Sequence, residues 1–188
     1  MSPTLNYLSS TLSMIAMVFY VIGAIGYANN KDTIKNVPWI TSEQSGVTAY
    51  YALKKVYIEG QGLEFEQTYS ACSDNDGNAC DKCEDDGKGA FGLCIIGAII
   101  AFCAMFVCGS LSRSVSFSMQ IVSIVLAALA CAAGVIALGL FMGNCYDELD
   151  DQTPVDLEWG AGAILVIISM FMMAGVSILQ ILSTFIVK

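Results

Sequence analysis

The sequence contains no histidine, and basic residues are scarce. Without histidine the chain lacks the commonest general base, the commonest transition-metal ligand, and the Ser-His-Asp and Cys-His arrangements of nucleophilic catalysis. Eight Lys and Arg against 17 Asp and Glu give a net charge of −9, which argues against nucleic acid as a partner. We therefore expect no enzyme activity, no cofactor, no resident metal and no nucleic-acid partner.

Charge is missing altogether from four long stretches, residues 1–30, 89–112, 114–146 and 159–187. About 20 helical residues cross a bilayer core of ~30 Å, so each stretch is long enough to span a membrane. The chain is 56% hydrophobic, with a mean hydropathy of +0.66. We predict one membrane domain, residues 1–188, built as a four-helix transmembrane bundle with spans at residues 8–27, 89–111, 116–142 and 160–187.

Four spans place both termini and a short turn, residues 112–115, on one side of the membrane. The other side receives loop 1, residues 28–88, and loop 2, residues 143–159. It carries all 17 acidic residues and six basic residues, which leaves a net charge of −11. The first span could also be a signal peptide ending at Gly26-Tyr27-Ala28, but it lacks a positive n-region, so we expect it to be retained. The last two spans exceed the length a flat bilayer needs and should tilt or project.

Four of the eight cysteines lie in the acidic loops: Cys72, Cys80, Cys83 and Cys145. An even set of thiols outside the spans predicts two disulfides in an oxidising compartment, which makes this side extracellular or luminal. Three pairings are possible, and the turn-forming residues 73–78 favour Cys72 with Cys80, leaving Cys83 for Cys145. A zinc site at Cys80 and Cys83 is the alternative, although no histidine is available to it.

Loop 1 has the pattern of a small antiparallel β-sheet. Apolar and polar residues alternate over residues 63–70, and β-branched and aromatic residues are dense over 47–58, so we predict two strands joined by a turn at Gly60-Gln61-Gly62. Residues 37–41 form a possible short edge strand because Pro38 cannot donate to a ladder. The fold class predicted is thus α-helical and membrane-integral, with a small extracellular sheet.

This layout resembles the claudin-like four-span superfamily, which includes claudins, peripheral myelin proteins and amastins. Pro38-Trp39 resembles the early tryptophan of a claudin first loop, and Cys72 with Cys80 resemble its paired cysteines. Thr68-Tyr69-Ser70-Ala71 stands where claudins have Gly-Leu-Trp, and Cys83 and Cys145 have no claudin counterpart. The resemblance implies the bundle-and-sheet fold and a role in membrane association.

The spans hold no ionisable residue, which disfavours an active transporter. Small residues predict close helix packing within the bundle, or a self-association face, and two glutamines predict hydrogen bonds between helices. These helix-packing candidates are Gly97, Ala101, Ala130, Gly134, Gly139, Gly143, Gln120 and Gln180.

The outer loops hold the candidate interaction residues, which are aromatic in loop 1 and acidic in loop 2: Trp39, Phe65, Tyr69, Asp147, Glu148, Asp150 and Asp151. We predict a non-enzymatic protein that associates laterally or between cells, or serves as an accessory subunit. Its partners would be membrane lipid and either other membrane proteins or copies of itself. An oligomeric cation-permeable pore is the alternative, and the acidic loops could bind divalent cations weakly. We expect the plasma membrane with cytoplasmic termini, or else a secretory-pathway vesicle membrane.

Overall fold

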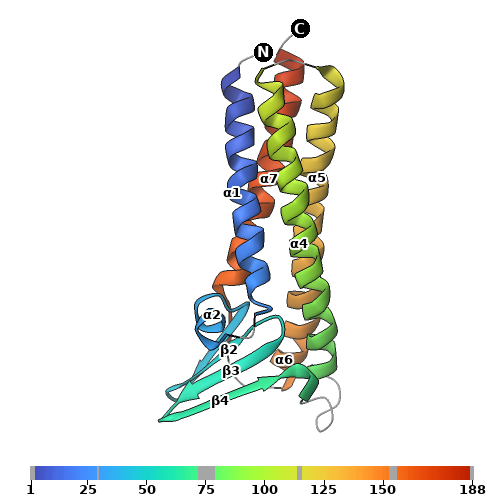
Figure 1. Cartoon of the computed structure of the whole chain (residues 1–188). Coiled ribbons are helices and arrows are strands. Elements are labelled where there is room, and N and C mark those ends of the chain that lie inside the picture. Colours follow the sequence, from blue (N-terminus) through green and yellow to red (C-terminus); the bar gives the residue numbers. More distant parts are fainter. Residues whose placement is uncertain (1–2, 29, 72–78, 114–115, 153–155, 187–188) are drawn as a thin grey trace.

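The computed structural model describes residues 3–28, 30–71, 79–113, 116–152 and 156–186. Within these ranges four helices are long and apolar enough to span a membrane. They are α1 (Pro3–Ile25), α4 (Ala79–Leu111), α5 (Phe117–Leu140) and α7 (Ala161–Ile186). α1 and α5 each contact both α4 and α7, so the four helices form a bundle, with a β-sheet at one end and both termini at the other (Figure 1). These helices indicate an integral membrane protein.

Two helices extend beyond their predicted spans at the sheet end. α4 begins ten residues before the predicted start at residue 89, so the last part of the predicted loop 1 is helical. α5 continues through a π-helical turn, η1 (Phe141–Cys145), into α6 (Tyr146–Gln152), so most of the predicted loop 2 is helical as well. The helices that run beside the sheet are thus the second and third, and α7 does not project with them (Figure 1).

The sequence analysis assigned the start of α4 to loop 1 because that segment is highly charged. The 33 residues of α4 would measure about 50 Å at 1.5 Å per residue, well beyond a ~30 Å hydrocarbon core. Its extra turns stay helical because Cys83 and Ala90 are buried against the core, while Asp81 and Asp85 point outward. A helix that leaves the membrane beside a protein surface needs only one apolar stripe.

The centre of the bundle is built around Tyr20, which the sequence analysis did not single out. Its hydroxyl donates a 2.7 Å hydrogen bond to the carbonyl of Ala130. A Cβ added at Gly97 would lie 3.2 Å from the ring, and one added at Gly134 would lie 2.6 Å from the hydroxyl. Ala101 is fully buried nearby in the same core. Four of the predicted small residues therefore line the helix contacts.

The other two glycines do not pack the bundle. A Cβ added at Gly139 or Gly143 would meet nothing within 4 Å, because both positions lie on the outward side of their helix. The glutamines are buried as predicted for interhelical groups. Gln180 Nε2 donates to Asn6 Oδ1 at 3.2 Å, which links α7 to α1, and Gln120 lies in the first turns of α5.

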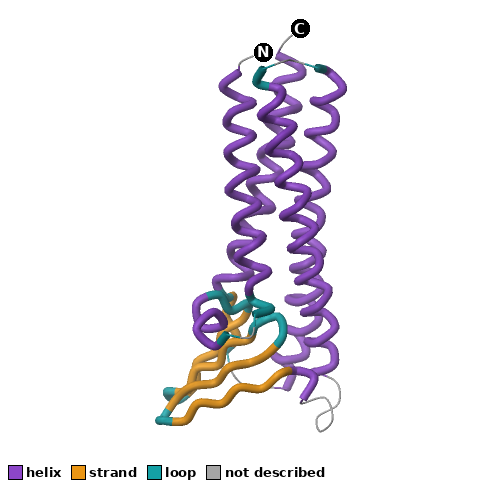
Figure 2. Tube along the Cα trace, viewed as in Figure 1, coloured by secondary structure: helices purple, strands orange, loops and turns teal. Residues whose placement is uncertain are grey.

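The sheet has five antiparallel strands in the described part of the chain, in the order β4-β3-β2-β1-β5. Figure 2 shows the strands together at one end of the helices. The strands are β1 (Ile40–Gln44), β2 (Val47–Tyr51), β3 (Lys55–Gly60), β4 (Leu63–Thr68) and β5 (Leu157–Trp159), and the short helix α2 (Lys31–Asn36) precedes them. β5 comes from the predicted loop 2, so both loops contribute to one sheet.

Two strand predictions need correction, and one short helix was missed. The single strand predicted over residues 47–58 is a hairpin, β2 and β3, that reverses at residues 52–54. The predicted edge strand at residues 37–41 is an inner strand, β1, that begins at Ile40 and pairs with both β2 and β5. α2 was not predicted. The turn expected at Gly60-Gln61-Gly62 is confirmed, with positive φ at Gln61 and Gly62, as a two-residue hairpin turn requires.

Candidate interaction surface

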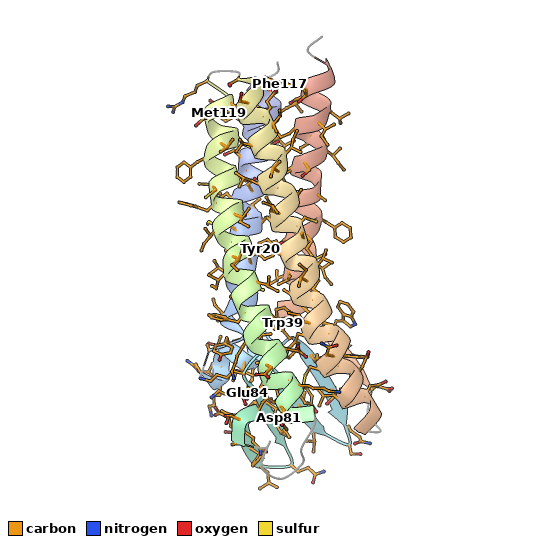
Figure 3. The ribbon with its side chains drawn as sticks, turned by 90° about the vertical axis from the view of Figure 1, so that its right-hand side faces the viewer. Tyr20, Trp39, Asp81, Glu84, Phe117 and Met119 are labelled. Atoms are coloured by element: carbon orange, nitrogen blue, oxygen red, sulfur yellow. A yellow bond between two sulfur atoms is a disulfide. The ribbon has the colours of Figure 1, made fainter. Side chains whose placement is uncertain are left out.

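We call α2 and the five strands the sheet domain. Its first attachment to the bundle is Trp39, whose side chain is 0% exposed. The indole Nε1 donates to the carbonyl of Gly23 in α1 at 3.0 Å, and the ring meets Phe141 edge-on at 5.4 Å between centroids. A Cβ added at Gly162 of α7 would lie 2.7 Å from the ring. Trp39 therefore joins three helices to the sheet (Figure 3) and is not available to a partner, contrary to the expected interaction role.

The second attachment is the turn between β2 and β3. Leu53 is fully buried, and its amide donates to the carbonyl of Gly26 at the end of α1 at 3.0 Å. A Cβ added at Gly87 of α4 would lie 1.8 Å from the Leu53 carbonyl oxygen, so only glycine fits there. The turn is thus wedged between two helices.

Tyr69 closes this turn from the other side. Its hydroxyl donates to the carbonyl of Ala52 at 3.0 Å, and the side chain is buried. Burial raises the pKa of Tyr69, so that the phenol stays neutral and keeps its proton for this bond. Tyr69 therefore has a structural position, and it does not offer the exposed surface that the sequence analysis expected of it.

The two helices that extend beside the sheet are themselves linked covalently. Cys83 of α4 and Cys145 of η1 form a disulfide, the link expected between the two loops. A zinc site at Cys80 and Cys83 is wrong, because Cys83 has no thiolate to offer. Cys80 is also disulfide-bonded, and its expected partner Cys72 lies outside the described residues. The Cys83–Cys145 disulfide thereby holds together the extensions of α4 and α5 at the sheet end.

The two faces of the sheet are covered differently. The face that carries Ile40, Ala49 and Tyr51 packs into the core of the bundle. The opposite face is covered by α2, where Ile34 packs against Tyr57. The free edge strand, β4, pairs with β3 alone in the described sheet, and α2 contacts its outer face through the ion pair of Lys31 with Glu64.

The free edge of the sheet is the most exposed apolar part of the sheet domain. Leu63 is 77% exposed and Phe65 is 52% exposed. Phe65 of β4 pairs with Ile58 of β3. Leu63 of β4 pairs with Gly60 of β3, which in turn pairs with Val47 of β2. The side chains of Val47, Ile58, Leu63 and Phe65 therefore all lie on the bundle-facing side of the sheet. We call Val47, Ile58, Leu63 and Phe65 the apolar strip. Of the three aromatic candidates from loop 1, Phe65 alone lies on the surface.

The other face of β4 is charged and internally paired. Glu64 accepts a 3.1 Å hydrogen bond from Lys31 of α2, and Glu66 accepts one from Lys55 of β3. The Lys31 ammonium lowers the pKa of the Glu64 carboxyl, so Glu64 is ionised at neutral pH. Charged side chains on an edge strand oppose uncontrolled strand pairing. A partner would therefore meet the apolar strip and not the backbone of the edge.

The acidic candidates of the predicted loop 2 lie on α6, next to the charged start of α4. Asp81, Asp85 and Asp86 of α4 and Asp147 of α6 line an open cleft of about 600 Å³, and Figure 3 labels Asp81 and Glu84 at this end of α4. Asp150 is exposed on α6. The side chains of Glu148 and Asp151, on the same helix, lie outside the described part. No group of three metal-binding side chains converges among the described residues.

The sequence matches no protein-family model and no curated protein. The class of protein is therefore defined by its own architecture. Four helices able to span a membrane carry a five-stranded sheet domain that both loops build and that Trp39 and the Leu53 turn fix in place. A disulfide joins the two helices that extend beside this domain.

Proposed function

We propose that this protein is a non-enzymatic, claudin-like membrane protein whose sheet domain mediates association with other membrane proteins or with copies of itself. The association is lateral, intercellular, or that of an accessory subunit in a larger complex. We place the sheet domain outside the cell and the termini in the cytoplasm, with a secretory vesicle as the alternative membrane. The apolar strip carries this proposal.

Three features support association at this strip. Leu63 and Phe65 are exposed apolar side chains outside the candidate membrane spans, and neighbouring exposed apolar side chains often mark contact surfaces. The sheet domain is fixed to the bundle, so a partner loses little freedom of this chain on binding. The remaining β4 side chains are charged and paired within the chain, which limits association to one face.

The likeness to claudins rests on layout. A large first loop with strands, a short turn and a smaller second loop follow one another along the chain. The expected rise of the last two spans is not part of this likeness, because the second and third helices extend beside the sheet instead. Trp39 begins the strand region where a claudin first loop has its tryptophan. The disulfide between Cys83 and Cys145 is an addition to that pattern, and it ties the two loops together more tightly.

The experiment is the mass of the gently extracted particle that contains this chain. Wild-type protein should travel in an assembly larger than the 20.0 kDa of a single chain. The double variant Leu63→Ser/Phe65→Ser should weaken association about ten-fold or more, because buried apolar anchors dominate contact energies. A wild-type particle that is a single chain would overturn the proposal.

The matched control is Trp159→Ser. Trp159 is half exposed on β5, at the opposite edge of the same sheet, so the change removes a comparable apolar area away from the strip. Its assembly should match the wild type. Equal loss in both variants would contradict an interaction centred on β4.

The second candidate is an oligomeric cation-permeable pore, which the acidic cleft favours. Four carboxylates around about 600 Å³ would concentrate cations at the mouth of such a pore. Reconstituted protein should then carry currents whose cation preference falls in Asp85→Asn/Asp147→Asn. Bilayers that stay silent with assembled protein would exclude it.

A further inference from the structure

A second cleft lies at the far end of the bundle from the sheet, between α1 and α4. It measures about 420 Å³. Tyr7, Met105 and Phe106 form its apolar wall, and Ser110 and Arg113 lie at its polar end. The exposed faces of Tyr7 and Phe106 belong to two candidate spans, so one side of the cleft opens toward the lipid.

Arg113 is the single charged residue between Lys88 and Asp147 in the sequence. Its side chain is exposed and makes no ion pair with any acidic residue of the described part. The carbonyls nearby are already occupied: Ser10 donates to Met105 at 3.1 Å, Ser112 to Gly109 at 2.6 Å, and Asn6 to Leu111 at 3.1 Å. With no carboxylate of the described part beside it, the guanidinium is available to an anion from outside, and the Ser110 hydroxyl lines the same cleft.

We propose that this cleft binds a phosphate group, that of a membrane lipid, with the Arg113 guanidinium on the phosphate oxygens. The planar guanidinium fork matches phosphate geometry and stays charged at every physiological pH. The apolar wall takes the first part of an acyl chain, and Tyr7 has the apolar body and polar tip of a side chain at the headgroup level. A soluble phosphate would gain nothing from the wall of Met105 and Phe106.

The test counts lipids retained by the purified full-length protein in native mass spectrometry. The probes are phosphatidic acid and a diacylglycerol with the same acyl chains, which differ by the phosphate alone. Wild type should retain phosphatidic acid, and Arg113→Gln should lower its retention about five-fold, the effect of one basic residue near an anionic surface. Arg113→Lys should keep most of the retention because the charge remains.

The matched control is Lys88→Gln, which removes one positive charge at the sheet end of the same helix. Its retention should equal that of the wild type. Equal retention by wild type and Arg113→Gln, or equal retention of phosphatidic acid and diacylglycerol, would overturn the proposal. If inorganic phosphate displaces the lipid with the same dependence on Arg113, the phosphate site stands and its ligand is soluble. None of these outcomes bears on the apolar strip.

Discussion

Trp39 has two separate contributions at the junction of the bundle and the sheet. Its ring fills a space that two glycines leave open, since a Cβ at Gly26 or Gly162 would lie 3.0 Å or less from it. Its Nε1 donates to the carbonyl of Gly23, which also accepts from the Gly26 amide at 3.3 Å where α1 ends.

We predict that Trp39→Phe destabilises the protein by about 1–3 kcal/mol, because it removes the buried hydrogen bond from Nε1 to Gly23 and leaves a cavity beside Phe141. The measurement is thermal unfolding of the purified protein in detergent, followed by circular dichroism. Trp159→Phe is the control and should change the midpoint little, because Trp159 is half exposed. An unchanged midpoint for Trp39→Phe would contradict the anchoring role.

Single residues were only partly predictable from the sequence. Burial of Gln180 and of four small residues, Gly97, Ala101, Ala130 and Gly134, followed from their places in uncharged spans, whereas Gly139 and Gly143 are exposed. The roles of Trp39 and Tyr69 did not follow, because an aromatic residue in a loop has the same pattern whether it faces a partner or fills the protein's own core. Tyr20 gave no signal at all, since an aromatic residue is ordinary in an apolar helix.

The elements of this fold are fixed by contacts between distant parts of the chain. The turn between β2 and β3 contains no glycine, proline or asparagine, and for that reason the sequence predicted a continuous strand there. Its reversal is held by Gly26, Gly87 and Tyr69, which lie on three other segments. β5 is three residues long, too short to recognise from alternation.

We predict that Gly87→Ala pushes the Leu53 turn off α4 and costs about 1–3 kcal/mol through overpacking. Hydrogen exchange at the Leu53 amide should quicken, because its bond to Gly26 is lost. Gly92→Ala on the same helix is the matched control: its added Cβ meets nothing within 4 Å, and alanine favours the helix by up to about 1 kcal/mol. Similar exchange in both variants would contradict the wedge.

The attachment of α2 to β3 and β4 depends on pH. Hydrogen bonding from Lys35 lowers the pKa of Glu59, and hydrogen bonding from Lys31 lowers the pKa of Glu64. A lowered folded-state pKa gives stability that is complete above the ordinary carboxyl value of 4.5 and is lost as pH falls through the folded value. We predict that the stability difference between wild type and Lys35→Gln shrinks as pH drops from neutral to below 4.5.

Thermal unfolding of both proteins across this pH range measures the difference. Lys88→Gln serves as the control, because its partners Glu84 and Asp85 lie on α4 and not on the sheet. A difference that stays constant with pH would show that these carboxylates do not fasten α2.

At the scale of the whole molecule, every bundle helix runs between the sheet end and the end that holds both termini (Figure 1). The shortest of the four, α1, has 23 residues, about 35 Å of helix. The spans were predictable because a hydrocarbon core imposes its length on any sequence that crosses it. The extensions of α4 and α5 were not, because outside the membrane the same helices obey ordinary amphipathic packing.

We predict that Glu43→Cys and Ser112→Cys react with a membrane-impermeant maleimide from opposite sides of the membrane. Glu43 is exposed on β1, and Ser112 lies in the turn after α4. In intact cells Glu43→Cys should be labelled, and Ser112→Cys should be labelled after permeabilisation. Wild-type protein gives the background of the four free cysteines. Labelling of both variants from one side would contradict a membrane-spanning bundle.

The pairing of β1 with β5 sets an order of events during biosynthesis. Ile40 finds its neighbour Trp159 only after the intervening chain has been made, which takes on the order of 10 s at about 5–20 residues per second. Until then β1 presents an unpaired edge, while the first three candidate spans have already been made. A nascent chain of this kind would depend on a chaperone at its sheet end, and one that stalls before the fourth span should be recognised as unfinished and degraded.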